Sequence, residues 1–125
     1  MRIFEKSNIL IFLMPHQLRA YKAAVFQALS HPTRIAIIDL LRERELPVGD
    51  FVEHLGLEQA NLSQHLAVLR SRQIVITRKA GNQVIYSVRD PLIWKILDLM
   101  RRYFQKQVSE SMAMLEETEK KEIRR

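Results

Sequence analysis

The stretch EQANLSQHLAVLRSRQ, residues 58–73, limits what this chain can fold into more than any other. Leu62, Leu66 and Leu69 recur at the spacing of one helix face, so we expect a helix that buries that face in a core. The rest of its surface is small or hydrogen-bonding, and no carboxylate, lysine or arginine occurs between Glu58 and Arg70. Solvated helix faces usually carry charged residues. This surface therefore indicates contact with another molecule.

The charge of the chain indicates an acidic partner. The 125 residues have a net charge of +6 and a pI near 10.0, and nucleic acid is the commonest acidic partner. Residues 58–89 contain five basic residues and one acidic residue, whereas residues 31–57 contain three and five. A merely solvated surface usually mixes both signs. The candidate binding region is therefore the segment 58–89.

Length and composition exclude several classes of protein. The chain is long enough for one compact domain, and its 47% hydrophobic content supports a core. It has no cysteine, which excludes disulfides, thiolate metal sites and thiol redox switching. The longest apolar run, residues 9–14, is far shorter than the roughly 20 residues of a membrane-spanning helix. Glu5 lies upstream of it and no small-residue cleavage site follows, so we expect a soluble, cytoplasmic protein rather than a secreted one.

Two helices are predicted ahead of residue 45. Apolar residues at helical steps predict a first helix over 17–29. Ser30 is a plausible N-cap for the next helix, with Pro32 in its first turn. That second helix is apolar on more than one side, which indicates a central, buried position.

A helix-turn-helix is predicted around Gly56. Residues 45–50 break the preceding helix, and a short helix then runs through Phe51 to Leu55. Gly56 suits the left-handed position at a helix end, and only one or two residues separate it from the helix of 58–73. Two helices joined by a tight turn with glycine form this motif.

A β-hairpin is predicted directly after that motif. Residues 74–77 and 84–88 are rich in β-branched and aromatic side chains, and residues 78–83 between them have turn chemistry. Arg78 and Lys79 make the tip basic. Such charges can simply protect a strand edge from pairing. Next to a helix whose surface and charge indicate a nucleic-acid partner, however, a basic tip that contacts phosphate or the minor groove is the better explanation.

A long last helix is predicted from Asp90, which would cap it ahead of a proline suited to the first turn. An apolar stripe follows one face for more than 20 residues, and the charged tail after Glu116 is expected to fray. Packing within the chain is one explanation of the stripe, but its length favours contact with a second copy. The stripe consists of Ile93, Leu97, Met100, Phe104, Val108, Met112 and Leu115.

The uncharged surface of residues 58–73 has the chemistry that the DNA major groove requires. Small residues permit close approach, glutamine and asparagine pair with adenine, and serine reaches a base edge or a phosphate. We predict base contacts from Gln59, Asn61, Ser63 and Gln64. Contacts on or near the DNA backbone are predicted for Arg70, Arg72, Arg78, Lys79, Asn82 and Tyr86.

Four stretches of the chain resemble the ArsR/SmtB family of winged-helix repressors. They are ALSHPTR at 28–34, VGDF at 48–51, LSQHLAVLR at 62–70 and VIYSV at 84–88, and the resemblance spans about residues 17–104. It implies an α+β, mostly helical winged helix-turn-helix of five helices with a two-stranded β-hairpin wing. It also implies a homodimeric bacterial repressor that binds double-stranded DNA at a pseudo-palindromic operator and is released by a signal. The first and last helices would form the dimer interface, from Leu18, Tyr21, Ile93, Leu97, Met100, Phe104 and Val108.

This resemblance divides the chain into three parts. Residues 1–16 form an N-terminal extension, residues 17–116 the winged helix DNA-binding and dimerisation domain, and residues 117–125 a charged tail. The apolar run at 9–14 would add to the dimer core or line a small-molecule pocket. Met14 is an alternative start.

The sequence departs from the metal-sensing members of that family. Residues 46–50 stand where one family site has paired cysteines, and no histidine follows His65 where another site uses histidine on the last helix. We therefore predict no metal and no cofactor, with His65 as a structural, hydrogen-bonded histidine. A new site made by Asp50, Glu53 and His54 is a minor alternative. The signal that releases the DNA stays open: it could be an apolar ligand, a protein partner, pH or the amount of the protein itself.

Functions other than DNA binding fit the sequence less well. A polar helix face that stands alone is most often simply solvated. A winged-helix protein-interaction module without DNA binding would carry acidic residues in place of the arginines and lysine of 70–79. RNA binding is weaker, since Tyr86 is the one aromatic residue of the basic segment. An enzyme is not expected, because the chain has neither a glycine-rich phosphate loop nor a nucleophile elbow.

Overall fold

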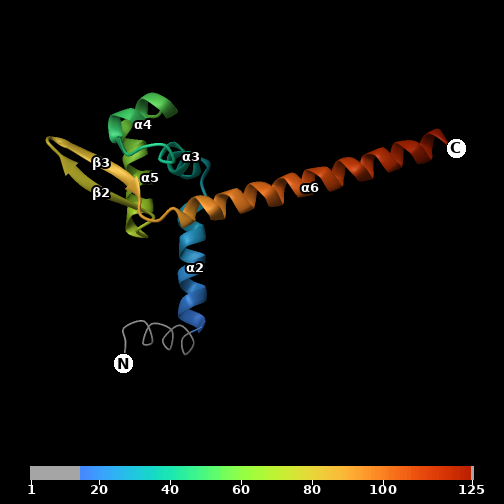
Figure 1. The fold of residues 1–125 in the computed structure, drawn as a ribbon, viewed down its shortest axis with the longest axis horizontal. Coiled ribbons are helices and arrows are strands. Elements are labelled where there is room, and N and C mark those ends of the chain that lie inside the picture. Colours follow the sequence, from blue (N-terminus) through green and yellow to red (C-terminus); the bar gives the residue numbers. More distant parts are fainter. Residues whose placement is uncertain (1–14, 125) are drawn as a thin grey trace. The chain divides into compact units, whose positions relative to one another are not determined.

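The computed structural model describes residues 15–124 and divides the chain after Asp90 into two compact units. Over the described residues, the first unit contains four helices and a small sheet, and the second is a single long helix (Figure 1). The helices of the first unit are α2 (Pro15–Leu29), α3 (Pro32–Leu40), α4 (Val48–Leu55) and α5 (Gln59–Ser71). The strands are β1 (Leu46–Pro47), β2 (Val75–Ala80) and β3 (Gln83–Val88), and the second unit is α6 (Leu92–Ile123).

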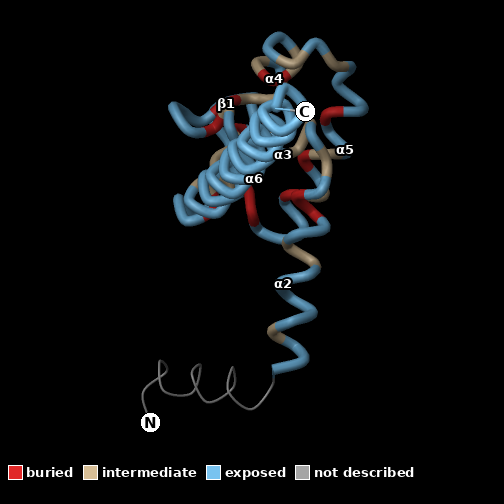
Figure 2. The backbone as a smooth tube through the Cα atoms, turned by 90° about the vertical axis from the view of Figure 1, so that its right-hand side faces the viewer, coloured by how far each residue is buried: buried red, intermediate tan, exposed pale blue. Residues whose placement is uncertain are grey.

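The core of the first unit lies where α3, α4, α5 and the base of the sheet meet. Its least accessible side chains are Ile37, Ile38, Phe51, Leu62, Leu66, Leu69 and Val75. The buried segments, red in Figure 2, gather in this unit. Burial of each such side chain is worth about 1.5–3 kcal/mol. Three of them belong to α5, so the core fixes the orientation of that helix.

The sheet has one strand more than the sequence predicted. The hairpin of β2 and β3 is confirmed, with antiparallel pairing from Val75 opposite Val88 to Ala80 opposite Gln83. The break predicted at 45–50 instead contains β1, which pairs with β3 and gives the order β1-β3-β2. A strand of two residues has no periodicity to detect. Its proline is tolerated because β1 is an edge strand.

The turn that precedes α5 follows the prediction, whereas the cap of α3 does not. Gly56 has a φ of 63° and its N–H donates to the Val52 carbonyl, so it ends α4 in the left-handed conformation. The N-cap of α3 is His31 rather than Ser30: its Nδ1 accepts from the Thr33 N–H at 3.1 Å. The Ser30 hydroxyl instead donates back to the Gln27 carbonyl of α2.

The last helix differs from the prediction at both ends. Pro91 occupies the N-cap position that was predicted for Asp90, and Pro91 makes no side-chain cap hydrogen bond. At the other end α6 continues to Ile123, so the fraying predicted after Glu116 is wrong for residues 117–123. Glutamate four residues before lysine stabilises a helix, and Glu116 and Glu117 precede Lys120 and Lys121 at that spacing. Almost the whole length of α6 is exposed (Figure 2).

Candidate nucleic-acid interface

Helix α5 presents an uncharged polar face to solvent. All four residues predicted to contact bases are exposed: Gln59, Asn61, Ser63 and Gln64. At 3.6 residues per turn, Gln64 lies opposite the buried leucines, with Ser63 on one side and Asn61 on the other. Ala60 and Ala67 lie between them and are also exposed. Small side chains on this face therefore let another molecule approach the helix closely, and the polar side chains offer hydrogen-bonding groups.

The hairpin projects from the helices as a two-stranded ribbon (Figure 1). Its tip is a two-residue loop, Gly81-Asn82, between the paired residues Ala80 and Gln83. Gly81 has a φ of 64°, which L-residues adopt only with strain, so glycine is required at this turn. Lys79 and Asn82 are exposed at the tip. A narrow ribbon of this kind brings a basic side chain well away from the core.

Arg78, one residue before Lys79, is held differently. Its Nε lies 2.8 Å and its Nη2 2.7 Å from Oε2 of Glu45, the residue before β1. The carboxylate neutralises the guanidinium locally. Arg78 is therefore paired with a carboxylate that the sequence did not indicate, and its contact with the DNA backbone stays a prediction.

Tyr86 belongs to the base of the hairpin. It is half-buried, pairs with both Leu46 and Thr77, and packs its ring edge-to-face on Phe51 at a centroid distance of 6.3 Å. Such aromatic contacts are worth about 0.5–1.5 kcal/mol beyond the buried area. Tyr86 therefore anchors the hairpin on α4.

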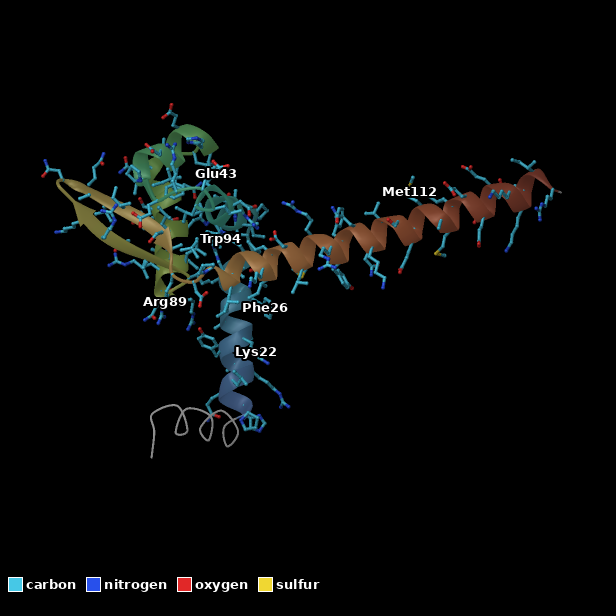
Figure 3. All side chains as sticks on the ribbon, viewed as in Figure 1. Lys22, Phe26, Glu43, Arg89, Trp94 and Met112 are labelled. Carbon is cyan, nitrogen blue, oxygen red and sulfur yellow. The ribbon has the colours of Figure 1, made fainter. Side chains whose placement is uncertain are left out.

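The C-terminal end of α5 gathers basic side chains. Arg70 and Arg72 are exposed there. Gln73 follows with a φ of 56°, and its side-chain oxygen accepts a hydrogen bond from Nη1 of Arg89, just after β3. Figure 3 labels Arg89 near this junction. Arg89 is a third arginine beside the helix end, and the sequence did not single it out because it lies 16 residues beyond Gln73.

His65 occupies the boundary between the exposed face of α5 and the core. It is half-buried, and its Nδ1 accepts a hydrogen bond from Nε of Arg34 at 3.2 Å. Burial, followed by the neighbouring His31 and Arg34, lowers the pKa of His65 below its usual 6.5. This geometry agrees with the structural role predicted for His65.

Residues 31–77 match the family model of the bacterial regulatory proteins of the arsR family. The chain is 42% identical over 97 residues to the HTH-type transcriptional regulator Rv0081 of Mycobacterium tuberculosis, across 77% of this chain and 85% of the relative. The crystal structure of Rv0081 matches with a TM-score of 0.70 and 41% identity, over 76% of this chain and 96% of the other.

This chain belongs to the arsR family. Two further relatives are named as regulators with opposite effects. The biofilm growth-associated repressor of Xylella fastidiosa strain 9a5c is 33% identical over 82 residues, across 66% of this chain and 72% of the relative. The transcriptional activator HlyU of Vibrio cholerae is 33% identical over 85 residues, across 68% and 79%. The predictions of an ArsR-type transcriptional regulator and of a DNA-binding winged helix-turn-helix are thereby confirmed, in preference to a protein-interaction module.

The alternative metal site of this arsR-family protein is not assembled. Nδ1 of His54 lies 2.8 Å from the Asp50 carbonyl oxygen of its own helix, so the ring is engaged with the backbone. Within residues 15–124, no three histidine or carboxylate residues come together as ligands for a metal ion. Over the same residues, none of the helices has the length and apolarity to span a membrane.

The residues predicted for the dimer interface differ in exposure. On α2, Leu18 is half-buried and Tyr21 is exposed; on α6, Ile93 is buried and Leu97 half-buried. The other three, Met100, Phe104 and Val108, are exposed, Phe104 at 66% of its surface. Figure 3 shows that Lys22 and Phe26 also project from α2 and Met112 from α6.

A second apolar row runs along α6 beside the predicted one. Its members have the same four-three-four spacing and are all exposed: Leu92, Ile96, Leu99 and Tyr103. Because the two rows are adjacent, the first three turns of α6 are apolar over about half of the helix surface. The spacing of this row is present in the sequence, beside the stripe that the sequence predicted.

Proposed function

We propose that this arsR-family protein is a homodimeric repressor that binds double-stranded DNA through α5 and the hairpin. The observation that carries the proposal is the exposed face of Gln59, Asn61, Ser63 and Gln64, on a helix that three buried leucines fix from behind. Rigid placement matters because a bidentate contact to a base edge tolerates little displacement. In this proposal Gln64, directly opposite the core, reaches deepest into the major groove.

The cations around α5 are assigned to the DNA backbone. Lys79 and Asn82 at the hairpin tip, together with Arg70 and Arg72 at the helix end, would contact phosphates on either side of the groove. Arg89 adds to the same positive field. Such contacts raise affinity for any duplex and make it dependent on salt, whereas base contacts decide sequence.

Dimerisation is proposed through α2 and α6. Without a partner, Met100, Phe104 and Val108 of α6 would stay exposed to water. Soluble monomers rarely expose contiguous apolar surface of that kind. A two-fold dimer presents two α5 helices to half-sites about one DNA turn apart. Repression needs less of such a dimer than activation does. A dimer bound at a promoter blocks RNA polymerase, whereas an activator also needs a surface that contacts the polymerase. We propose no catalytic role.

The assignment of base contacts to α5 and of phosphate contacts to the hairpin tip is tested by fluorescence anisotropy. Binding is measured to a duplex selected by the protein and to a random duplex. Gln64→Ala should lose about 1–3 kcal/mol of discrimination between the two, because one bidentate base contact disappears. Lys79→Ala should weaken both equally and reduce the salt slope by about one per protomer. Equal effects of both variants on both duplexes would contradict the assignment. Transcription in vitro from a promoter that carries the selected site checks the sign: added protein should lower the transcript, and an increase would contradict repression.

A further inference from the structure

Arg34 connects three helices of the first unit through its guanidinium group. Its Nη1 donates to the carbonyl oxygens of Ala28, at 3.0 Å, and Gln27, at 3.4 Å, in the last turn of α2. Its Nε donates to Nδ1 of His65, in the middle of α5. Arg34 itself belongs to the first turn of α3. One half-buried side chain therefore links the end of α2 to the helix that carries the base-contacting face.

This connection requires a neutral imidazole at His65. A nitrogen that accepts a hydrogen bond carries no proton, so the His65 ring is in the tautomer with its proton on Nε2. Protonation of Nδ1 would convert the acceptor into a donor that faces another donor, the Nε–H of Arg34. The hydrogen bond would be lost and a second positive charge would stand beside the guanidinium.

The neighbouring groups oppose that protonation. The ring of His31 lies 4.3 Å from the ring of His65 between centroids. His31 is itself an acceptor, since its Nδ1 receives the Thr33 N–H at the start of α3. From α2, the backbone carbonyls of Ala28 and Gln27 accept hydrogen bonds from Arg34. The charged or titratable groups that act on His65 are His31 and Arg34, both on the α3 side, with no carboxylate among them.

The hydrogen bond between Arg34 and His65 can affect DNA binding because of where His65 lies on α5. His65 is one helical turn after Asn61, so the two side chains lie on the same side of the helix. A shift of His65 away from Arg34 would therefore displace a proposed base-contacting residue. Contacts to base edges lose most of their energy with small displacements, because hydrogen bonds weaken steeply with distance and angle.

We propose that Arg34 and His65, with His31 beside them, form a proton-sensitive clamp that adjusts the position of α5 on the core: it keeps the helix in the DNA-binding position at neutral pH and lets it shift in acid. The proposal rests on the proposed DNA binding by α5. It assigns Arg34 as a positioning residue, not as a contact to DNA.

The direction of the pH effect follows from the two states of the clamp. In the engaged state the pKa of His65 is lowered by burial, His31 and Arg34, whereas in the released state it returns toward its ordinary 6.5. The released state thus binds more protons. Affinity for DNA is complete above about pH 6.5 and is lost as the pH falls from there through the lowered pKa. One proton per protomer limits the slope to about one decade of affinity per pH unit for each protomer.

The first test measures affinity for the selected duplex by anisotropy between pH 5.5 and 8 at constant ionic strength. His65→Asn places a carboxamide oxygen near the position of Nδ1, so it keeps an acceptor for Arg34 but does not titrate. His54→Asn makes the same substitution on α4 and is the matched control. The affinity of the wild type and of His54→Asn should fall between pH 7.5 and 5.5, by up to about tenfold per protomer, and that of His65→Asn should change by less than about twofold. An unchanged pH profile in His65→Asn overturns the proposal.

A second measurement does not depend on the variant or on DNA. Long-range proton–nitrogen NMR spectra of the wild type should show His65 with its proton on Nε2 and a titration midpoint below the ordinary 6.5. A proton on Nδ1, or a midpoint at or above 6.5, overturns the clamp. Circular dichroism at pH 5.5 should show an intact helical signal; its loss would mean that the protein unfolds in acid, which also overturns the proposal. If no duplex is bound selectively at pH 7.5, the proposed function fails, and the NMR titration alone decides the clamp.

Discussion

The ion pair between Glu45 and Arg78 makes a quantitative prediction about the hairpin. Both Nε and Nη2 of Arg78 contact one carboxylate oxygen, with the arginine side chain 58% and the glutamate side chain 45% exposed. Water screens a pair with this exposure, so its contribution to the free energy of unfolding is about 0.2–1 kcal/mol. Glu45→Gln keeps an oxygen acceptor but removes the charge that neutralises Arg78. The variant should therefore remain folded, with a loss of stability below about 1 kcal/mol.

Binding to DNA should change more than stability does. Release of Arg78 adds one cation to the hairpin of each protomer. The slope of log K against log salt should become steeper by about 0.9 per protomer, and affinity at low salt should rise equally for selected and random duplexes. Discrimination between the duplexes should stay constant, because no base contact changes.

The matched control is Glu43→Gln, in the turn after α3. It removes the same charge two residues earlier and leaves the pair of Glu45 and Arg78 intact. Anisotropy titrations at four salt concentrations measure both slopes. A slope for Glu45→Gln that equals the wild type, or equals that of Glu43→Gln, would refute the reasoning. In that case Arg78 either stays in place without its partner or lies too far from the phosphates.

Three further predictions concern packing, backbone and assembly. Leu66→Ala, at a site that is 1% exposed, should lower the free energy of unfolding by about 2–5 kcal/mol in urea titrations; a loss below about 1 kcal/mol would mean that α5 is not fixed by the core. Gly56→Ala should cost about 1–2 kcal/mol from its φ of 63° alone, since an added Cβ would meet no atom within 4 Å; an unchanged urea midpoint would contradict the left-handed turn. Phe104→Glu should shift the sedimentation of the protein toward the monomer, whereas Ile123→Glu, near the end of α6 and off both rows, should not. Equal sedimentation of the two variants would place the interface elsewhere.

The parts of the fold that were predicted correctly have local signals. The leucines of α5 recur at helical spacing, Gly56 occupies a position that few other residues tolerate, and β-branched runs flank a turn at Gly81. Each signal lies within a dozen residues, where side-chain periodicity and backbone preference decide the conformation. These three features were enough to predict the helix-turn-helix and the hairpin.

The parts that were missed depend on contacts between distant positions. Strand β1 exists only because β3, about 40 residues later, supplies its hydrogen bonds. Arg34 and His65 are 31 residues apart, and Glu45 and Arg78 are 33 apart. Charge alone cannot tell whether an arginine is paired or available to a phosphate, so Arg78 and Lys79 looked equivalent. The contacts from Gln59, Asn61, Ser63 and Gln64 to bases remain predictions, since exposure is necessary for them but not sufficient.

The claim that α5 reads DNA sequence is tested most directly by selection from a library of random duplexes, with the wild type and with Gln64→Ala in parallel. The wild type should enrich a pseudo-palindrome whose half-sites are centred about 10–10.5 base pairs apart. Gln64→Ala should lose preference at one position in each half-site and keep the remainder. Enrichment of no common sequence by the wild type, with weak binding that disappears as salt rises, would contradict the central claim and leave only attraction to the phosphate backbone.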